Sequence, residues 1–414
     1  MDYFDYKNGV LHCEDADMVS LAKTHATPAY VYSKATLHRH CKKFKEAFAD
    51  IDHTLCYAVK ANSNLSILKE IFSLGFGADV VSIGEIERSL LAGVDPSKIV
   101  FSGVGKKKEE ILRGIELGIK SFNVESLFEL ERLQRFAEEV GKKARVCLRV
   151  NPNIDAKTNP KITTGLYTSK FGISEELLPE VLNSLKDKKN LELVGIACHI
   201  GSQITTIDPL KEATQRMADL AETLKTSGFN LEFINMGGGL GIKYRDENPP
   251  SLEEYAEAIK GTMRKTGLSL VLEPGRVLVG NIGTLITEVI GVKKTPEKNF
   301  VIVDAAMNDL LRPSMYDSYH EIISAEKTQT ETICCDIVGP ICESGDFLGK
   351  DRDIACPVEG DFLVVRGCGA YGATMASNYN SRTRPVELLV AGDSAVVIKR
   401  REKLSELWDK EPLG

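Results

Sequence analysis

The sequence predicts an α/β protein: a (β/α)8, TIM-like barrel followed by a second, C-terminal domain that is a β-sandwich or β-barrel. Three observations support this. The chain has 414 residues, which suits two domains or one large barrel with an appendage. Eight short apolar segments alternate with helix-like segments over the first two-thirds of the chain. After Gly283, strand-like segments follow one another without long helices between them.

The barrel strands are expected where short apolar or β-branched runs occur, as is typical of parallel strands buried on both faces. These runs are Leu55–Val59, Ala78–Ser82, Ile99–Ser102, Phe122–Glu125, Arg145–Val150, Val194–Ile200, Phe233–Met236 and Leu270–Glu273. An open, doubly wound sheet would show the same alternation. The count of eight favours the closed barrel.

Two of the intervening helices carry a sequence signal for their first turn. Ser126 is followed three residues later by Glu129, and Ser251 by Glu254. In this spacing the serine and the glutamate can each accept a backbone N–H at the helix start. We therefore expect a capping box at both helices.

The second domain is predicted from strands that lack helical connections. They are Leu285–Val292, Phe300–Val303, Glu331–Ile337, Phe362–Arg366, Val386–Val390 and Ala395–Ile398. Asn8-Gly9 predicts a type I′ hairpin near the N-terminus, and the strand Tyr30–Tyr32 is surplus to the eight. We expect residues 35–280 to form the barrel, and residues 1–34 with 281–414 to form the β domain.

Composition narrows the class of protein. The net charge is −7 with 27% charged residues, and no basic face suggests binding to nucleic acid. No apolar run is long enough to span a bilayer, and the first residues do not resemble a secretory signal. Ten cysteines without a Cys-x-x-Cys pair indicate reduced thiols in a cytoplasmic protein, with neither disulfides nor a metal site.

Several chemically useful residues fall at the carboxyl ends of the predicted strands, where barrel active sites assemble. Lys60 ends the first strand, and partial desolvation there would free its amine as a nucleophile. A structural alternative is an ion pair with a carboxylate such as Asp79. His199 follows a later strand, where a histidine is either catalytic or a polar residue with satisfied hydrogen bonds.

Two glycine-rich segments follow the last two strands. Gly237-Gly238-Gly239 would let backbone amides approach an anion, although a glycine run can also be a tight turn. Glu273-Pro274-Gly275-Arg276 could place opposite charges at one site or form a structural ion pair. Loops in this position commonly bind phosphate in barrels. With the amine of Lys60, these segments suggest pyridoxal 5′-phosphate as cofactor.

The β domain adds three further motifs. Arg312 and Tyr316 are four residues apart, and Cys342 lies beside Glu343 in a turn-rich segment. Tyr371 stands among glycines. Each motif alone is as compatible with ordinary loop structure as with catalysis.

In this order, the motifs resemble those of the alanine-racemase-like, fold type III pyridoxal-phosphate decarboxylases over nearly the whole chain. The matching segments are Tyr57–Asn62, His199–Ser202, Gly237–Gly239, Glu273–Arg276, Arg312–Asp317, Cys342–Asp346 and Gly369–Gly372. The chain departs from the family pattern at Asn159 and Lys161, where a histidine and an aromatic residue are usual, and at Thr383, which replaces a proline.

The resemblance implies how each matching barrel residue would contact the cofactor. Lys60 would hold the cofactor as a Schiff base, His199 would stack on its ring, and Glu273 would keep the pyridine nitrogen protonated. The phosphate would lie against three further residues, which are Gly238, Gly275 and Arg276.

The resemblance also implies a substrate-binding set. Arg276, Arg312 and Tyr316 would bind a distal carboxylate, and Tyr371 would contact cofactor and substrate. Cys342 and Glu343 would come from the partner subunit of a homodimer with shared active sites. Cys342 is the favoured donor of the proton that replaces the lost carboxylate.

The implied reaction is that of a carbon–carbon lyase, which decarboxylates meso-2,6-diaminopimelate to L-lysine and CO2 as the last step of lysine biosynthesis. Decarboxylases of ornithine or arginine type share Lys60, His199 and the glycine-rich segments, and are the alternative. They act on substrates that end in a cation, whereas Arg312 suits a second carboxylate and Glu343 a second amine. An amino-acid racemase and a non-catalytic homologue fit the Cys342 segment less well.

Overall fold

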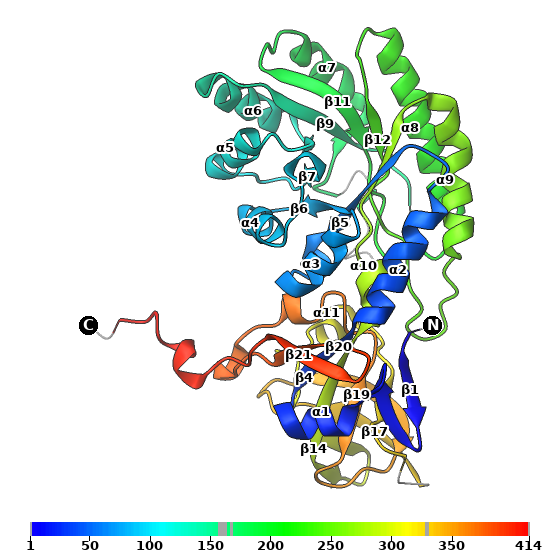
Figure 1. Cartoon of the computed structure of the whole chain (residues 1–414), viewed down its shortest axis with the longest axis vertical. Coiled ribbons are helices and arrows are strands. Elements are labelled where there is room, and N and C mark those ends of the chain that lie inside the picture. The colour runs from blue at the N-terminus through cyan, green and yellow to red at the C-terminus, as the bar shows by residue number, and fades with distance from the viewer. Residues whose placement is uncertain (1, 156–163, 166–168, 328–330, 413–414) are drawn as a thin grey trace. The chain divides into compact units, whose positions relative to one another are not determined.

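The computed structural model describes residues 2–155, 164–165, 169–327 and 331–412 (Figure 1). The chain divides into two compact units. The barrel unit consists of His40–Ile242 and Asn248–Val277, and the β unit of Met1–Arg39, Lys243–Glu247 and Leu278–Gly414. Each is described by itself below.

Eight parallel strands of the barrel unit form a closed ring. They are β5 (His53–Ala58), β6 (Gly77–Val80), β7 (Ile99–Phe101), β8 (Ser121–Val124), β9 (Ala144–Asn151), β11 (Leu191–Ala197), β12 (Phe233–Asn235) and β13 (Ser269–Leu272). The last strand, β13, pairs in parallel with the first, β5, which closes the ring. The closed barrel is therefore confirmed over the open sheet. A short strand, β10 (Ile173–Ser174), pairs with β9 alongside the ring.

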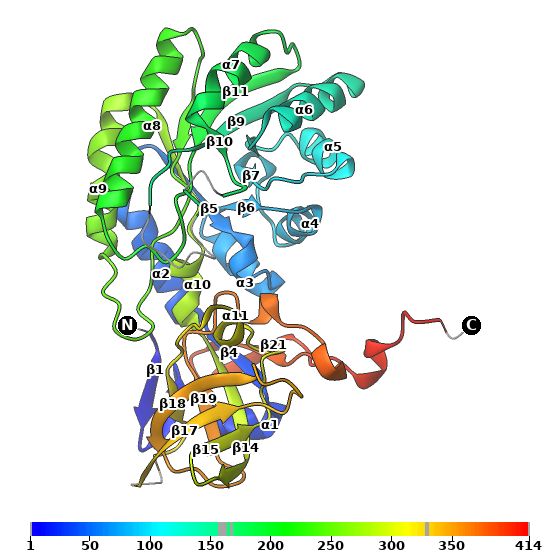
Figure 2. The same cartoon turned by 180° about the vertical axis from the view of Figure 1, so that it is seen from behind.

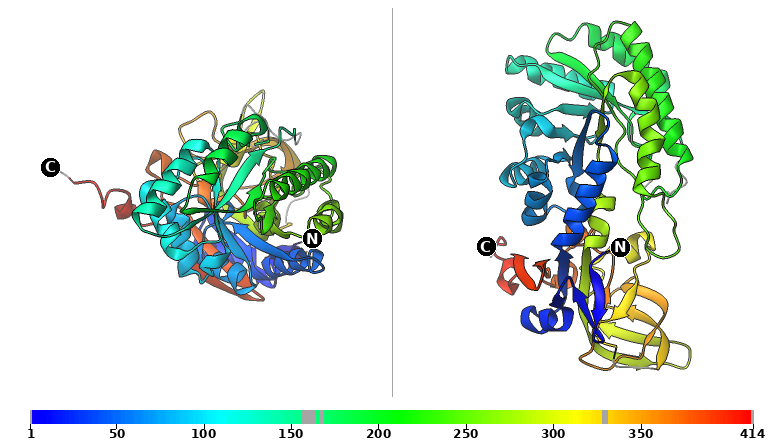
Figure 3. Two further views of the ribbon diagram at one scale, coloured as in Figure 1. Left: turned by 90° about the horizontal axis from the view of Figure 1, so that it is seen from above. Right: turned by 45° about the vertical axis from the view of Figure 1, so that its right-hand side comes forward.

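Helices follow the strands and surround them (Figure 3, left). In chain order they are α3 (Leu65–Ser73), α4 (Ile83–Leu91), α5 (Lys108–Leu117), α6 (Leu127–Glu139), α7 (Leu178–Lys186), α8 (Asp208–Thr226) and α9 (Leu252–Thr266). The helices α2 (Lys34–Ala47) and α10 (Arg276–Val279) lie at the ends of this series. Inside the ring, apolar side chains such as Val100, Phe233 and Val271 form a buried cluster.

Only one of the two predicted capping boxes is complete. At α9, the Ser251 hydroxyl accepts the Glu254 N–H and the Glu254 carboxylate accepts the Ser251 N–H. At α6, Ser126 accepts the Glu129 N–H, but the Glu129 carboxylate accepts the N–H of Glu125 instead. That carboxylate also binds Lys106, which explains why the reciprocal bond is missing.

The β unit contains a mixed sheet whose connected order is β18-β17-β15-β14-β4-β20-β21, with β16 and β19 pairing beside it (Figure 2). The strands are β4 (Ala29–Ser33), β14 (Gly283–Lys294), β15 (Asn299–Val303), β16 (Ile322–Ser324), β17 (Thr332–Val338), β18 (Phe347–Ala355), β19 (Phe362–Val365), β20 (Val386–Ala391) and β21 (Ser394–Lys399). The surplus strand of the sequence is β4, which lies inside this sheet, antiparallel to β14 and parallel to β20.

The N-terminal hairpin forms a separate small sheet of β1 (Phe4–Lys7), β2 (Val10–Cys13) and β3 (Ala16–Asp17), which α1 (Met18–His25) follows. Asn8 and Gly9 both have positive φ angles, 51° and 84°, as a type I′ turn requires. The hairpin turn is therefore confirmed.

Two strands of the mixed sheet, β16 and β18, were not predicted. The strand β16 has only three residues, too few for a periodic signal. The strand β18 carries the charged run 350–353, which gives no apolar alternation. Because β18 lies at the edge of the sheet, charged side chains there are typical and protect the edge against further pairing.

All ten cysteines lie in the described part of the chain, and each is a free thiol. Among the described helices, none combines the length and the apolar composition that a membrane-crossing segment needs.

The Lys106–Glu129 ion pair yields a prediction about stability. Both side chains are almost fully buried, and the Lys106 ammonium also donates to the backbone oxygens of Gly103 and Asn123. Replacing Lys106 by Met would leave the Glu129 carboxylate buried without its counter-charge. We expect Lys106→Met to lower the free energy of unfolding by about 3–5 kcal/mol in urea titrations.

A matched control uses the next lysine but one. Lys108 pairs with Glu139 at the surface, where both side chains are about half exposed. Lys108→Met should therefore cost less than about 1 kcal/mol. Adding Glu129→Gln to Lys106→Met should recover part of the lost stability. Equal effects of the two single variants would contradict the prediction.

Candidate functional site

The predicted cofactor lysine lies just beyond its strand. Lys60 belongs to the 3-10 turn Val59–Ala61 that follows β5, and not to the strand itself as predicted. Its ammonium contacts a carboxylate oxygen of Asp79 on β6 at 2.8 Å. Asp79 is fully buried, whereas the Lys60 side chain is 41% exposed. The ion pair that the sequence left as an alternative is thus present, and the amine still reaches solvent.

Glu273 follows β13 directly and is held by two asparagine side chains. The amide groups of Asn235 and Asn123 donate to one Glu273 oxygen at 2.6 Å and 3.2 Å. Asn123 also donates to the hydroxyl of Ser102, and the Asn235 amide oxygen accepts the N–H of Gly237. These bonds connect the carboxyl ends of four barrel strands to one carboxyl group.

The environment of Glu273 favours its neutral form. Burial is the largest cause and the Asp79 carboxylate the second, and together they raise the pKa of Glu273 to about 7. The Lys60 ammonium, the Asn235 hydrogen bond and Arg149 act in the opposite direction and lower this pKa. A carboxyl group poised near neutral pH at a barrel's carboxyl end is typical of an active site.

His199 lies two residues past the end of β11 and is neutral. Its Nδ1 accepts the backbone N–H of Gly238 at 3.2 Å. Burial, together with the nearby charges of Arg149 and Lys60, holds the pKa of His199 well below its usual range. The imidazole therefore presents an uncharged ring, and Nε2 carries the proton.

The glycine run packs against both neighbouring segments. Gly237 and Gly239 have φ angles of 65° and 114°, which other residues rarely adopt. A Cβ atom on Gly238 would lie 2.2 Å from the Glu273 carbonyl oxygen, and one on Gly237 would lie 2.7 Å from His199 Nδ1. Glycine is required here because the backbones are so close.

The segment after Glu273 reaches the turn that carries Lys60. The Pro274 carbonyl accepts the N–H of Ala58, and a Cβ atom on Gly275 would approach the Ala58 side chain to 3.0 Å. Arg276 is buried and donates to the hydroxyl of Ser202 at 3.1 Å. The barrel unit therefore brings together Lys60, His199, Gly238, Glu273, Gly275 and Arg276.

Four polar residues of this region were missed as site residues: Asp79, which the sequence suggested only as a structural partner, Asn123, Arg149 and Asn235. Each lies near the carboxyl end of a barrel strand and is buried. Arg149 binds Glu125 at 3.1 Å and lies over the Phe171 ring. Each of the four is a polar residue within an otherwise apolar strand, and this is the feature of the sequence that could have identified it.

The remaining predicted residues belong to the β unit. Arg312 and Tyr316 begin and end the short helix α11 (Arg312–Tyr316), which brings them together. Cys342 and Glu343 are exposed in the loop between β17 and β18, where the Cys342 N–H donates to the Asn380 side chain. Tyr371 is partly buried and has a φ angle of 58°. Their functional roles stay predictions.

Arg312 is a buried cation without a described counter-charge. Its guanidinium binds His320 and Ser318, both neutral acceptors, and no described carboxylate lies within ion-pair distance. Holding such a charge is costly unless an anion completes the pair. An anionic ligand group would supply that pair.

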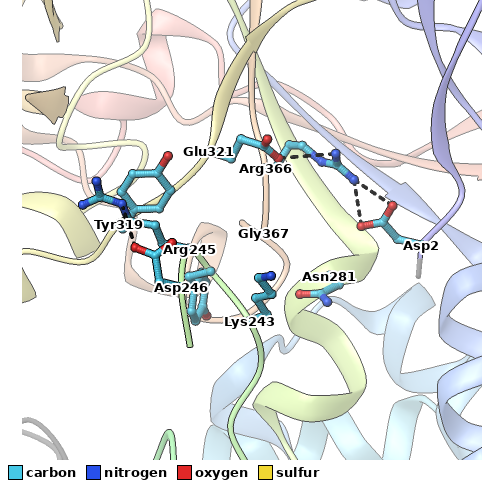
Figure 4. A pocket seen from close by; sticks show the side chains of 10 residues that line it. Asp2, Lys243, Arg245, Asp246, Asn281, Tyr319, Glu321, Arg366 and Gly367 are labelled. Atoms are coloured by element: carbon cyan, nitrogen blue, oxygen red, sulfur yellow. Dashed lines mark hydrogen bonds and ion pairs between the residues drawn. The ribbon is translucent and has the colours of Figure 1, made fainter. Parts of the chain in front are cut away.

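A cavity of about 610 Å³ lies in the β unit, and Tyr244, whose ring lies under the Arg312 guanidinium, is one of its lining residues (Figure 4). It is lined by charged side chains of both signs, among them Lys243, Arg245 and Asp246. On its far wall Arg366 is bonded to Asp2 and Glu321. Neither Arg312 nor any of the other predicted site residues lines it.

The family departures at Asn159 and Lys161 lie outside the described residues. The end of that loop is described. The Gly172 N–H donates to Glu125, the same carboxylate that binds Arg149.

Comparison with known proteins places the chain among pyridoxal enzymes. Residues 34–280 match the family "Pyridoxal-dependent decarboxylase, pyridoxal binding domain". The chain is 51% identical over 401 residues to a diaminopimelate decarboxylase of Neisseria meningitidis, covering 97% of each chain. It is 49% identical over 413 residues to that of Vibrio cholerae, covering 99% of each. The structure of the M. jannaschii diaminopimelate decarboxylase with L-lysine matches with a TM-score of 0.95 and 39% identity, covering 100% of this chain and 98% of the other.

The raised pKa of Glu273 predicts a pH-dependent loss of stability in the cofactor-free protein. Its pKa rises from 4.5 to about 7 on folding, so the folded protein binds this proton more tightly than the unfolded chain. Stability from this group is present below about pH 4.5 and is lost as pH rises towards about 7. Glu273→Gln removes the effect.

We therefore expect the free energy of unfolding of Glu273→Gln minus that of the parent to rise between pH 5 and 7 and then to level off. Urea titrations at a series of pH values measure this difference. A difference that does not change with pH would show that the carboxyl group is already ionised in the folded protein.

Proposed function

This chain belongs to the diaminopimelate decarboxylases of the pyridoxal-dependent decarboxylase family, and from this we propose that it converts meso-2,6-diaminopimelate to L-lysine and CO2. This carboxy-lyase reaction is the last step of lysine biosynthesis. The observation that carries the proposal is the pairing, at one end of the closed barrel, of the solvent-reaching Lys60 amine with the buried carboxyl of Glu273.

The barrel residues fit pyridoxal 5′-phosphate. This cofactor supplies an aldehyde that takes an amine and a ring whose protonated nitrogen accepts the electron pair left by CO2. Lys60 would hold the aldehyde, and the uncharged ring of His199 would stack on the cofactor ring. The phosphate would be held by Arg276 and by the backbone at Gly238 and Gly275. At both glycines a side chain would clash with its neighbours.

Glu273 would serve the ring nitrogen. Its pKa of about 7 reflects burial beside Asp79, and a cation placed against it would favour the ionised form. The two asparagine bonds from Asn235 and Asn123 leave one carboxylate oxygen for that partner. Asp79 would orient the Lys60 amine through the 2.8 Å contact.

The distal end of the substrate would be recognised by opposite charges. Arg312, buried without a described carboxylate partner, would bind the distal carboxylate with help from Tyr316 and Arg276. Glu343 would pair with the distal ammonium. A substrate ending in a cation alone, such as ornithine or arginine, would leave Arg312 without its anion.

The working unit would be a homodimer with shared active sites. Cys342 and Glu343 are exposed on the β unit, as residues that complete a partner's site would be. Cys342 would deliver the proton that replaces the lost carboxylate, and Tyr371 would contact cofactor and substrate. The ten free thiols suit the reducing cytosol, where we place the enzyme.

A CO2-release assay across four amino acids tests the reaction. The parent should act on meso-diaminopimelate and poorly on lysine, ornithine and arginine. Arg312→Met should lower kcat/KM for meso-diaminopimelate about ten- to a hundredfold, since a charge-assisted contact is worth about 1.5–3 kcal/mol. It should not improve kcat/KM for lysine. A parent that prefers ornithine or arginine would support the alternative family reaction.

Subunit mixing tests the shared site. Lys60→Ala and Cys342→Ala should each be inactive, but a heterodimer of the two would contain one intact site. Random exchange should restore about a quarter of the parent activity, because half of the dimers are mixed and each has one intact site. With exchange confirmed by differently tagged subunits, a lack of restored activity would place both residues in the site of one chain.

A further inference from the structure

Arg312 is oriented entirely by neutral groups. Its Nη1 donates to Nε2 of His320 at 3.0 Å, and its Nη2 donates to the hydroxyl of Ser318 at 3.3 Å. The guanidinium also lies over the ring of Tyr244, 4.7 Å from the centroid. A guanidinium has five N–H donors, and these two bonds use two of them.

His320 contacts Arg312 in one defined tautomer. It is fully buried, and its Nδ1 lies 2.8 Å from the carbonyl oxygen of Arg366. A carbonyl oxygen only accepts, so Nδ1 must carry the proton. Nε2 is then free of a proton and accepts from Arg312 as part of a neutral imidazole.

The carbonyl that fixes His320 belongs to a well-supported part of the β unit. Arg366 directly follows β19, and its N–H donates to the Glu321 carbonyl at 2.8 Å, which continues the pairing of β19 with β16. The Arg366 side chain binds both carboxylate oxygens of Asp2, at 2.8 and 3.0 Å, and contacts Glu321 (Figure 4). The hydrogen-bond acceptor of His320 therefore has little freedom to move.

The aromatic neighbour completes the arrangement. The Tyr244 ring meets the His320 ring edge to face, with 5.5 Å between centroids. Gly367 lies against Tyr244, where a Cβ atom would be only 3.4 Å from the ring. Tyr244 thus supports Arg312 and His320 together.

A neutral acceptor has a particular advantage at this position. An aspartate or glutamate in place of His320 would orient the guanidinium equally well, but it would neutralise the charge and compete with an incoming carboxylate. The imidazole fixes the direction of Arg312 and leaves its positive charge available. A purely structural arginine gains nothing from this choice.

We propose that His320 is a positioning residue that holds the guanidinium of Arg312 ready for the distal carboxylate of the substrate. The inference rests on the proposed function, in which Arg312 binds that carboxylate. It predicts an effect confined to ligands that carry a distal carboxylate.

Three substitutions of His320 separate its hydrogen bond with Arg312 from its hydrogen bond with the Arg366 carbonyl. His320→Leu removes both bonds at similar volume. His320→Gln places an amide oxygen near the position of Nε2 and keeps the acceptor for Arg312. His320→Asn places an amide N–H near the position of Nδ1 and keeps only the bond to Arg366. Cofactor absorbance and thermal unfolding establish that each variant is folded and loaded.

We expect His320→Leu and His320→Asn to raise KM for meso-diaminopimelate at least tenfold with kcat changed less than threefold. His320→Gln should recover most of the affinity. The inhibition constant of 1,5-diaminopentane, which has the two amines but no carboxylate, should stay within twofold of the parent in all three variants.

The possible outcomes distinguish a failure of the proposed function from a failure of the role of His320. A parent enzyme without activity on meso-diaminopimelate would overturn the proposed function itself. An active parent with an unchanged KM in folded His320→Leu would overturn the role of His320. A rise in the inhibition constant of 1,5-diaminopentane that matches the rise in KM would also overturn it, because general damage to the site would then explain both.

Discussion

Two buried carboxyl groups beside one amine are the constraint on which the barrel site depends. Asp79 and Glu273 both lie at the carboxyl ends of barrel strands, and the Lys60 ammonium contacts Asp79 at 2.8 Å. Burial is the largest cause and the Asp79 carboxylate the second, and together they raise the pKa of Glu273 to about 7. The asparagine bonds to Glu273 fix its position without neutralising it.

The site also requires that the loops after the barrel strands approach one another closely, and glycine allows this because it has no side chain. The Gly237–Gly239 run lies against both the His199 and the Glu273 segments, and Gly275 lies against the end of β5. Side chains at Gly237, Gly238 and Gly239 would clash with the neighbouring backbone and force the loops apart. The amide of Gly238 could then no longer reach His199, and the hydrogen bond that orients the imidazole would be lost.

The sequence was most informative where one pattern meant one structure. Eight apolar runs gave the eight strands of the barrel, and Asn8-Gly9 gave the hairpin turn, because both depend on local residue types. The edge strand β18 was missed because its charged residues, which protect the edge of the sheet, hide the apolar alternation of a strand. Motif order led to Lys60, Glu273 and His199. It could not show Asp79 and Asn235 as members of the site, since their importance comes from which strands become neighbours in the closed ring.

Three buried cations of this chain differ in whether a carboxylate of the fold neutralises their charge. Lys106 and Arg149 are buried against the carboxylates of Glu129 and Glu125, so their charges are already compensated within the fold. Arg312 is equally buried but is held by a neutral imidazole and a hydroxyl. Evolution of a stable fold alone would favour a carboxylate at that position, because it lowers the cost of burying the guanidinium. The uncompensated charge is explained if the missing carboxylate arrives with the substrate.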